Sequence, residues 1–324
     1  MKPSPEFSLI EQYFQALTTR REDVIVGIGD DCAVLNNPRD SYMAVSIDTL
    51  VQDIHFFADV DPYCLGIKAL AVNLSDLAAM GAQPAWFTLA LTLPEINDDW
   101  LKQFSAGLAC IAKKYQIQLV GGDTTRGPLT ITIQVHGHVA KHNILQRNAA
   151  ESADLICVTG CLGDAAAGLQ FRLGQLETEL LTDTDIEYLL QRLEMPTPRN
   201  QIGQQLIGKA HAAIDVSDGL LADLNHILNA SHKGAKLDVS ALPFSVALKK
   251  LPTAMATQLA LTGGDDYELC FTATADNVAR LKHQFPEMIH VIGEITEDEG
   301  MYYQNAQGEW QVFSEIKAGY DHFA

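Results

Sequence analysis

Aspartates stand beside glycines or at expected strand ends in several short segments of this chain. The segments are Gly29-Asp30-Asp31, Ile47-Asp48-Thr49, Gly121-Gly122-Asp123, Asp215-Val216-Ser217-Asp218-Gly219 and Gly263-Gly264-Asp265-Asp266. Hard divalent cations prefer carboxylate oxygens, and Mg²⁺ is usually held by a few carboxylates together with substrate phosphates. If these strand ends converge, they predict a magnesium pocket for polyphosphate chemistry.

Each segment also has an alternative explanation that involves no chemistry. Asp30 and Asp31 fit an exposed turn, and the glycines before Asp123 fit a tight turn. Asp76 lies inside a strongly apolar helical segment, where its carboxylate could instead bond a neighbouring backbone group. Asp48 sits among apolar residues, where an unpaired carboxylate is costly to bury. Taken singly, these segments leave both interpretations open.

The run Asp215-Val216-Ser217-Asp218-Gly219 is the strongest local signal. It places two acids at the end of an expected strand and the start of an expected helix, where backbone N–H groups favour anions. Capping of that helix by Ser217 or Asp218 is the alternative. The two roles are compatible.

Composition restricts the partners that this chain can have. It has 324 residues, 47% hydrophobic content and a formal net charge of -19, with a pI near 4.7. This length favours two domains, and the acidic balance argues against nucleic acid or an anionic membrane as a partner. An anionic nucleotide avoids an acidic cleft unless bound cations reverse the local charge. We therefore expect metal ions with any phosphate substrate.

The cysteines and the start of the chain indicate a cellular compartment. The six cysteines show no C-x-x-C spacing, and most lie in apolar runs, as is typical of reduced core thiols. The first residues lack the apolar region of a signal peptide, and no apolar stretch is long enough to span a bilayer. We expect a cytoplasmic protein.

Hydrophobic periodicity predicts an α/β order in the first half of the chain. Strands are expected over residues 24–35, 42–51, 86–93, 117–120 and 129–139. Helices are expected over 98–115 and from Asp61-Pro62, where the aspartate caps the first turn. The strand at 117–120 should end in a Gly121-Gly122-Asp123 turn. Residues 129–139 alternate apolar and polar side chains, which predicts a half-exposed sheet.

The pattern restarts after a polar stretch at 141–154. We therefore place the domain boundary near residue 148, which gives domains 1–148 and 149–324. The second half predicts strands at 155–159, 212–216 and 267–272, a turn into a helix at 160–168, a break at 195–198 and a hairpin over 301–313.

The common nucleotide-binding motifs are absent from the sequence. It has neither a G-x-x-x-x-G-K-[ST] loop nor a kinase Gly-rich loop with a downstream lysine. Arg126 and Arg147 could contact phosphate oxygens, but each is equally consistent with a surface charge. A lone histidine such as His55 is more often a solvated or structural residue than a catalyst. A kinase with this sequence must depend on metals.

Longer motifs occur in a fixed order along nearly the whole chain. They are Phe7-Ser8-Leu9-Ile10, Gly27-Ile28-Gly29-Asp30-Asp31-Cys32-Ala33, Ser46-Ile47-Asp48-Thr49-Leu50-Val51, His55-Phe56, the stretch 68–82, Gly121-Gly122-Asp123-Thr124-Thr125, Asp215-Val216-Ser217-Asp218-Gly219-Leu220 and Gly263-Gly264-Asp265-Asp266-Tyr267-Glu268-Leu269. Together they closely resemble the thiamine-monophosphate kinase family. The resemblance implies a two-domain, mixed α/β fold of the aminoimidazole-ribonucleotide synthetase-like superfamily. It also implies a homodimer, with an N-terminal sheet contributing to the dimer interface and a C-terminal α/β domain completing the active site.

The resemblance also implies an activity and a set of site residues. The activity is the ATP-dependent phosphorylation of thiamine phosphate to thiamine diphosphate with several Mg²⁺ ions. By motif position, the implied metal ligands are Asp31, Ser46, Ile47, Asp48, Asp76, Asp123, Asp215 and Asp218. The implied ATP contacts are Gly122, Asp123, Arg147 and Ser217. The implied thiamine phosphate contacts are His55, Asp265 and Tyr320, and relatives often carry Glu and Trp at the last two positions.

The chemistry of the acceptor predicts direct in-line transfer. A phosphate monoester has a second pKa of about 6 and is largely ionised near neutral pH, so no side chain is needed as a general base. No histidine or serine stands in a nucleophile constellation, so no catalytic base or nucleophile is assigned. The alternatives are another ATP-dependent enzyme of the superfamily, of the purine cyclo-ligase or selenophosphate synthetase type, and a non-catalytic divalent-cation-binding protein.

Overall fold

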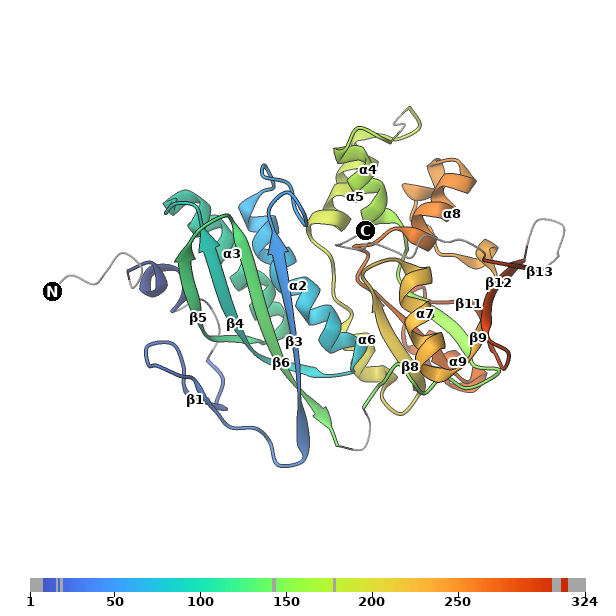
Figure 1. Ribbon diagram of the computed structural model, residues 1–324, viewed down its shortest axis with the longest axis horizontal. Helices are drawn as coiled ribbons and strands as arrows, with labels where there is room; N and C mark the ends of the chain where they lie inside the picture. The colour runs from blue at the N-terminus through green and yellow to red at the C-terminus, as the bar shows by residue number, and fades with distance from the viewer. Residues whose placement is uncertain are drawn as a thin grey trace. The chain divides into compact units, whose positions relative to one another are not determined.

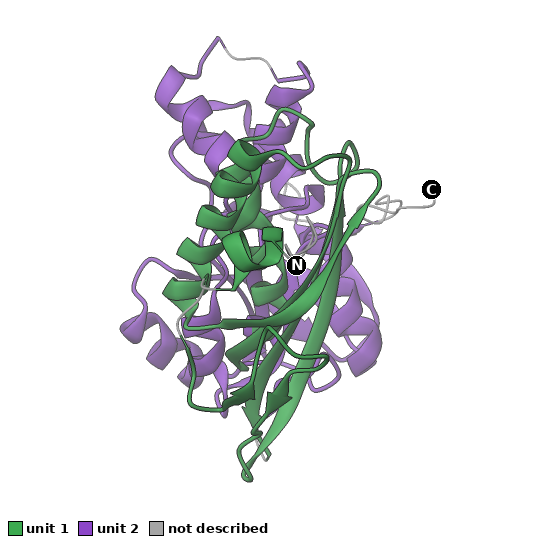
Figure 2. Cartoon of the chain, turned by 90° about the vertical axis from the view of Figure 1, so that its left-hand side faces the viewer, with its two compact units in different colours: residues 1–77, 82–142 green, residues 78–81, 143–324 purple. Residues whose placement is uncertain are grey.

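The chain forms two compact units, each with its own main sheet (Figure 1, Figure 2). Unit 1 comprises Met1–Leu77 and Ala82–His142, and unit 2 comprises Ala78–Gly81 and Asn143–Ala324. The computed structural model describes residues 8–15, 17, 20–141, 144–176, 179–304 and 310–313. The domain boundary near residue 148 stays a prediction.

Unit 1 is built on a four-stranded sheet in the order β3-β6-β4-β5. β6 pairs antiparallel with β3 and with β4, whereas β4 and β5 run parallel. Along β6, Ile131, Ile133 and Val135 are buried and alternate with partly exposed polar residues, so the predicted half-exposed strand is confirmed. The strands are β3 (Ser41–Val51), β4 (Gln83–Leu93), β5 (Gln118–Arg126) and β6 (Thr130–Ala140).

The helices of unit 1 lie on one side of this sheet (Figure 2). They are the short η1 (Ile10–Phe14), α2 (Pro62–Ala79) and α3 (Asp98–Tyr115). The Asp61 carboxylate accepts the N–H of Tyr63 at 2.7 Å, so the predicted cap of α2 is confirmed. α2 and α3 approach closely because Gly107 has no Cβ; a Cβ there would lie 1.9 Å from the Tyr63 carbonyl oxygen.

Two of the predictions for unit 1 are wrong. Residues 24–35 form two short strands, β1 (Val24–Val26) and β2 (Val34–Leu35), which pair antiparallel around a loop that includes the Gly-Asp-Asp segment. Gly121-Gly122-Asp123 is no turn, because β5 continues through it to Arg126. A Cβ at Gly122 would lie 1.9 Å from the Leu89 carbonyl oxygen of β4. Gly122 therefore allows β5 to pair closely with β4. Local turn propensity does not reveal this role, because it depends on a residue of another strand.

Unit 2 is built on a seven-stranded sheet in the order β13-β12-β9-β11-β7-β10-β8. The predicted strands at 155–159, 212–216 and 267–272 are confirmed to within two residues at each end, and the hairpin over 301–313 is confirmed as β12 paired antiparallel with β13. The strands are β7 (Leu155–Thr159), β8 (Ala210–Val216), β9 (Gly234–Leu237), β10 (Glu268–Ala273), β11 (Ile289–Thr296), β12 (Gly300–Gln304) and β13 (Trp310–Val312).

The core of unit 2 lies on both faces of this sheet. Ile156 and Ile214 pack in one cluster with residues of α7, whereas Cys157 and Ala213 pack in a second with residues of α6 and α9. Neighbouring residues of one strand thus face opposite cores. The helices are α4 (Asp164–Arg172), α5 (Asp183–Glu194), α6 (Asn200–Leu206), α7 (Leu220–Ser231), α8 (Thr253–Thr262) and α9 (Ala275–Gln284), with the short η2 (Val239–Ala241) and η3 (Leu248–Lys250).

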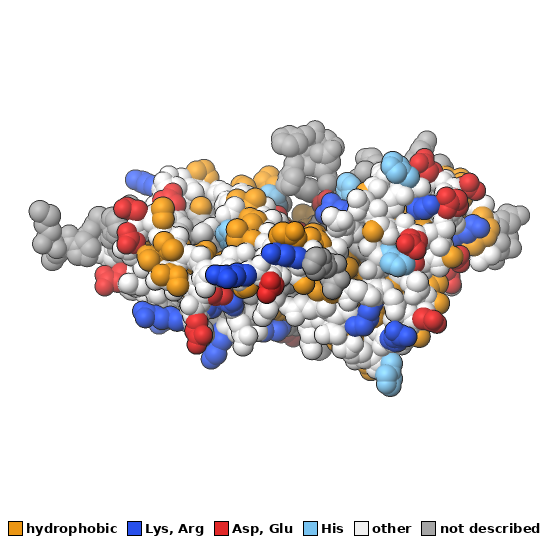
Figure 3. All heavy atoms as spheres, turned by 90° about the horizontal axis from the view of Figure 1, so that it is seen from below, with side chains coloured by type: hydrophobic (Ala, Val, Ile, Leu, Met, Phe, Trp, Pro, Cys, Tyr) orange, Lys and Arg blue, Asp and Glu red, His pale blue; other side chains and the backbone are white. Residues whose placement is uncertain are grey.

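The described surface carries charges of both signs. On the face drawn in Figure 3, basic and acidic side chains are interspersed, although the chain as a whole carries a formal charge of -19. Among the described residues, no helix combines the length and the apolar character that crossing a bilayer requires.

Glu268, at the start of β10, is the centre of a buried ion-pair network. Its side chain is 0% exposed and accepts hydrogen bonds from Arg199 Nε at 2.6 Å, from Arg192 Nη2 at 3.0 Å and from the Thr159 hydroxyl at 2.7 Å. Two guanidinium groups and a hydroxyl therefore replace the water that this carboxylate loses. The network joins β10 to α5 and to the segment before α6.

Asp266 lies two residues earlier and is also fully buried. Its carboxylate accepts the N–H of Gly163 at 2.6 Å and that of Ala165 at 3.3 Å, so it caps α4 from a distant loop. Burial raises the pKa of Asp266 to about 8 in spite of these donors. Below that pH the Asp266 carboxyl group that caps α4 is therefore mostly protonated and uncharged.

We predict that Asp266→Asn makes stability less dependent on pH. The pKa of Asp266 is 3.8 ordinarily, as in the unfolded chain, and about 8 in the folded protein. At a pH between these two values unfolding releases a proton, so the free energy of unfolding falls as pH rises. The melting temperature of the wild type should therefore drop more than that of the variant between about pH 5 and about pH 8.5. The exposed Asp40→Asn is the control, and equal drops in all three proteins would contradict the prediction.

Candidate functional site

Strand β3 and helix α2 bring three of the predicted metal ligands together. Ser46 and Asp48 are two residues apart on β3, so their side chains lie on the same face of the strand. The Ser46 hydroxyl donates to the Asp76 carboxylate on α2. One helical turn earlier, the Asn73 side-chain oxygen accepts the N–H of Asp48 at 3.2 Å. Two motifs that are separate in the sequence thus form one cluster, which we call the β3–α2 cluster (Ser46, Asp48, Asp76).

The electrostatics of the β3–α2 cluster favour a cation. Burial raises the pKa of Asp48 to about 7, and repulsion from the Asp76 carboxylate is the second cause. A cation placed near both carboxylates would oppose both effects. Ile47 is 57% exposed and its hydrocarbon side chain lies on the opposite face of β3. Because that side chain has no oxygen, the backbone carbonyl is the only ligand that Ile47 could offer.

The other predicted metal ligands of unit 1 lie at different places. Asp31 is exposed in the loop between β1 and β2, where its N–H donates to Asp30 Oδ1 at 2.9 Å. Asp123 is exposed on β5, and β6 and β4 separate β5 from β3. Neighbouring strands lie about 4.8 Å apart, so the backbones of β3 and β5, which are three spacings apart, are separated by roughly 14 Å. Direct contact between Asp123 and Asp48 is therefore excluded, and a shared metal between them is unsupported.

His55 follows β3 in a short turn. The Val51 N–H donates to its Nδ1 at 3.0 Å. A neutral imidazole that accepts at Nδ1 carries its proton on Nε2, which can donate to a phosphate oxygen. Asp53, with a left-handed φ of 63°, forms the turn that brings His55 back to the strand.

In unit 2, β8 leads into the segment 215–218, which carries the predicted metal ligands Asp215 and Asp218. Asp215 is 4% exposed near the end of β8, and Ser217 and Asp218 follow in a half-buried loop. The N–H groups of Ser217, Asp218 and Gly219 donate to Asp223 Oδ2 at 3.0, 3.1 and 3.2 Å. Burial raises the pKa of Asp223 to about 7.

This arrangement adds one detail to the sequence interpretation and corrects another. The N–H groups of Ser217, Asp218 and Gly219, which directly precede α7, donate to a side chain of the protein itself. Neither Ser217 nor Asp218 caps α7, because Gly219 is the residue that precedes the helix. Sequence reasoning missed Asp223, although an acid in the first turn of an expected helix is a known signal.

The Gly263-Gly264-Asp265-Asp266-Tyr267 loop lies directly against this motif. The N–H of Asp265 donates to the Ser217 carbonyl at 2.9 Å, and the N–H of Tyr267 donates to the Val216 carbonyl at 2.8 Å. The Tyr267 hydroxyl also donates to Asp265 Oδ1 at 3.1 Å. Asp265 and Tyr267 have left-handed φ values of 67° and 50°. The structure thus brings together Asp265 and Ser217, a predicted substrate contact and a predicted ATP contact.

Arg147 lies on an exposed segment that α7 holds in place. Its carbonyl oxygen accepts from the Ser231 hydroxyl at 3.0 Å, and the same hydroxyl oxygen accepts the N–H of Ala150 at 3.1 Å. Its side chain is exposed. Tyr320, the remaining predicted substrate contact, lies outside the described residues.

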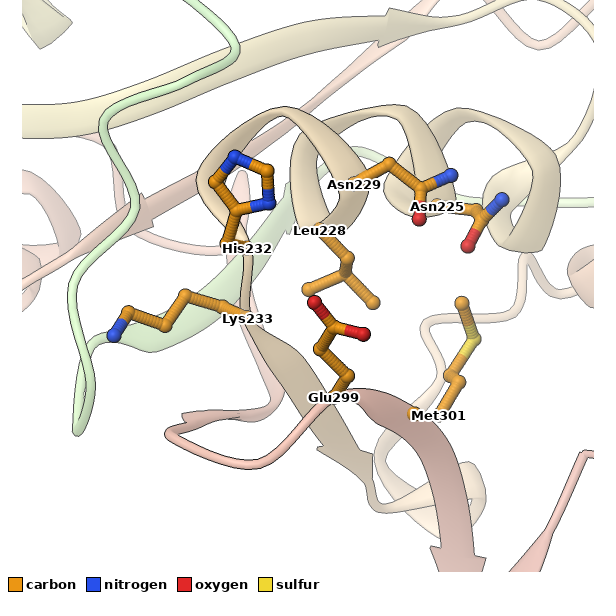
Figure 4. Close-up of a pocket in the computed structure, with 8 residues that line it drawn as sticks. Asn225, Leu228, Asn229, His232, Lys233, Glu299 and Met301 are labelled. Atoms are coloured by element: carbon orange, nitrogen blue, oxygen red, sulfur yellow. The ribbon is translucent and has the colours of Figure 1, made fainter.

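A separate groove lies at the C-terminal end of α7 (Figure 4). It has a volume of about 280 Å³, and Glu299 faces α7 across it. Lys233, at its edge, forms an ion pair with Glu297 at 2.7 Å. The groove is lined by Asn225, Leu228, Asn229, His232, Lys233, Glu299, Gly300 and Met301, none of which is a predicted site residue.

Comparison with known proteins identifies the family. Residues 29–139 match the N-terminal domain of AIR synthase related proteins, and residues 153–304 match the C-terminal domain. Thiamine-monophosphate kinase of Salmonella typhimurium is 48% identical to this chain over 98% of both sequences.

Solved structures agree with this similarity. A thiamine-monophosphate kinase from Stenotrophomonas maltophilia superposes with a TM-score of 0.82 and 45% identity, covering 90% of this chain and 93% of that one. AaThiL complexed with AMPPCP and TMP superposes with a TM-score of 0.76 and 29% identity over 89% of both chains. The chain therefore belongs to the thiamine-monophosphate kinase family of AIR synthase related proteins.

Proposed function

We propose that this chain transfers the γ-phosphoryl group of ATP to thiamine phosphate and so forms thiamine diphosphate. The observation that carries the proposal is the 48% identity to a thiamine-monophosphate kinase over 98% of both chains. A structural relative complexed with AMPPCP and TMP supports ATP and thiamine phosphate as the two substrates. Asp265, a proposed contact of thiamine phosphate, lies beside Ser217, a proposed contact of ATP, and this neighbourhood also supports a reaction between the two substrates.

The residues of the β3–α2 cluster fit a magnesium ion. They offer only oxygen donors, and burial followed by repulsion from the Asp76 carboxylate raises the pKa of Asp48 to about 7. Within the described parts of the chain, no group of three or more His, Cys, Asp or Glu side chains is arranged to hold a metal. Mg²⁺ usually takes one or two carboxylates and completes its shell with water and substrate phosphates, so a pair of carboxylates suffices.

The proposed residue roles follow the chemistry of each group. Bound Mg²⁺ would neutralise charge on the transferred phosphoryl group. The proposed ligands are Asp31, Ser46, the Ile47 carbonyl, Asp48, Asp76, Asp123, Asp215 and Asp218. Gly122, Asp123, Arg147 and Ser217 would contact ATP, and His55, Asp265 and Tyr320 would contact thiamine phosphate. No side chain is needed to take a proton, because the acceptor phosphate is already ionised near pH 7.

These residues would act by binding and orienting the two anions. Arg147, on its exposed segment, can pair with phosphate oxygens through its planar guanidinium. His55 can donate from Nε2 because Nδ1 is engaged with the Val51 N–H. In this proposal residues 1–148 form the metal- and ATP-binding and dimerisation domain, and residues 149–324 complete the site. The cysteine spacing favours the cytoplasm as the compartment.

The proposal is tested with a panel of phosphorylated acceptors, ATP and Mg²⁺, with products identified by mass. Thiamine diphosphate formed at the expense of ATP is the expected result. ATP consumption with a different acceptor would favour another enzyme of the superfamily. Uptake of Mg²⁺ without ATP consumption in the presence of thiamine phosphate would favour a non-catalytic binding protein.

We predict that Asp48→Asn weakens Mg²⁺ binding by about tenfold or more and lowers turnover, but leaves the fold intact. The variant should fold because Asn has nearly the shape of Asp, and burial already disfavours the charged form of Asp48 and raises its pKa. The measurements are the Mg²⁺ dependence of product formation and the rise in melting temperature that Mg²⁺ causes. Asp40→Asn is the control. Loss of fold would point to a structural role, and an unchanged Mg²⁺ dependence would remove Asp48 from the ligands.

We predict that His55→Ala raises the KM for thiamine phosphate more than the KM for ATP, because the variant loses the Nε2 donor. Steady-state kinetics with each substrate varied in turn measure the two constants. The exposed His283→Ala serves as the control. Equal changes in both constants would reject His55 as a substrate contact.

A homodimer is also part of the proposal. On the outer face of β3, Met43, Val45 and Ile47 are 50%, 50% and 57% exposed, and their neighbours across the pairing with β6 are His138, His136 and Gln134. A row of large apolar side chains on an end strand is typical of a covered interface. A second copy of the chain would bury it.

We predict that Val45→Lys shifts the protein from dimer to monomer, because a charge would have to be buried without a partner. Light scattering after size-exclusion chromatography measures the mass. The control is Val246→Lys, at a valine that is 75% exposed in unit 2. A wild type that elutes as a monomer would contradict the proposed dimer.

A further inference from the structure

Asp223 is buried directly behind residues 217–219, which include the predicted metal ligand Asp218. It lies in the first turn of α7 and is 3% exposed. One of its oxygens, Oδ2, accepts three successive backbone N–H groups at 3.0–3.2 Å, those of Ser217, Asp218 and Gly219. A single carboxylate therefore determines the direction of three consecutive peptide groups.

The loop cannot easily hold this shape without that carboxylate. Gly219 has a φ of +122°, and a Cβ there would lie 2.9 Å from the Thr262 carbonyl oxygen, so the backbone is tightly packed. Three N–H groups that point inward must be paired, because a buried donor without an acceptor is unfavourable. Asp223 supplies the acceptor that these groups need.

The other side of the same loop is fixed as well. The carbonyl oxygens of Val216 and Ser217 accept the N–H groups of Tyr267 and Asp265 at 2.8 and 2.9 Å. The motif is thus held between Asp223 on its inner side and the 263–267 loop on the other. The N–H groups of Ser217 and Asp218 and the carbonyl group of Ser217 therefore all have partners, which fixes the backbone that carries these two side chains.

We propose that Asp223 is a positioning residue, which holds the backbone at 217–219 so that Asp218 and Ser217 are directed toward Mg²⁺ and ATP. This inference rests on the proposed roles of those two residues. It assigns Asp223 no contact with substrate or metal. A purely structural cap of α7 would affect stability without affecting nucleotide binding selectively.

Asp223→Ala and Asp223→Asn test the proposal against a matched variant, Asp154→Ala. Asp154 is also a buried aspartate of unit 2, 2% exposed; it accepts the N–H of Glu151 at 3.0 Å and pairs with His211 Nδ1 at 2.8 Å near the start of β8, so its contacts do not involve residues 217–219. Hydrogen exchange of the amides at 217–219 is measured without nucleotide or metal. Calorimetry then measures ATP binding with Mg²⁺, and kinetics compare the KM for ATP with that for thiamine phosphate.

Asp223→Ala should lose protection at 217–219 and bind ATP with Mg²⁺ about 10- to 100-fold more weakly, as when a partner that orients metal ligands is removed. Its KM for ATP should rise more than that for thiamine phosphate. Asp223→Asn keeps one acceptor oxygen, so its protection at 217–219 and its ATP affinity should lie between those of Asp223→Ala and those of the wild type. Asp154→Ala should keep both the protection and the ATP affinity.

Two outcomes would overturn the inference. One is unchanged exchange at 217–219 in Asp223→Ala, and the other is lost protection with an ATP affinity equal to that of Asp154→Ala. If Asp223→Ala does not fold, Asp223→Asn decides by the same measurements. Failure of the wild type to form thiamine diphosphate would reject the proposed function alone, because exchange and ATP binding are read without turnover.

Discussion

A carboxylate taken out of water needs hydrogen-bond donors, a cation or its own proton, and this requirement governs the acidic motifs of both units. In unit 2 the requirement is met by the protein itself. Glu268 has two guanidinium groups and a hydroxyl, Asp266 has two backbone N–H groups, and Asp223 has three. Each of these acids therefore connects a motif loop to the scaffold, and the loops of unit 2 hold one another in place.

The β3–α2 cluster of unit 1 meets the same requirement differently. Asp48 and Asp76 repel each other, and burial is the larger cause of the raised pKa of Asp48. Asp76 accepts a hydrogen bond from the Ser46 hydroxyl, whereas Glu268 accepts from two guanidinium groups. A cation beside Asp48 and Asp76 would oppose this repulsion, whereas Glu268, Asp266 and Asp223 of unit 2 already have donors supplied by the protein. This contrast separates acids that build the fold from acids suited to chemistry, although both kinds stand in similar glycine-rich motifs.

Local patterns predicted the elements that carry a strong periodic or capping signal. α3 begins and ends at the predicted residues, and the cap of α2 by Asp61 follows from side-chain chemistry that acts within a single turn. The patterns failed where a glycine serves close strand pairing. Gly122 was assigned to a turn, yet its missing Cβ is what allows β5 to lie against Leu89 of β4. Gly122 and Leu89 are far apart in the sequence, so a rule based on neighbouring residues cannot predict their contact.

The sequence alone determined the acidic character of the motifs, the family resemblance and most of the helices and strands, because residue type, order and periodicity are local properties. The tertiary structure decided which acids meet. It joined Asp76 to Ser46, set Asp265 against Ser217, and paired Asp223 with the N–H groups of the loop before α7. It also put two strands between Asp123 and β3. Burial and pairing depend on segments far apart in the chain, and only their packing sets the partners and hence the charge state of each carboxylate.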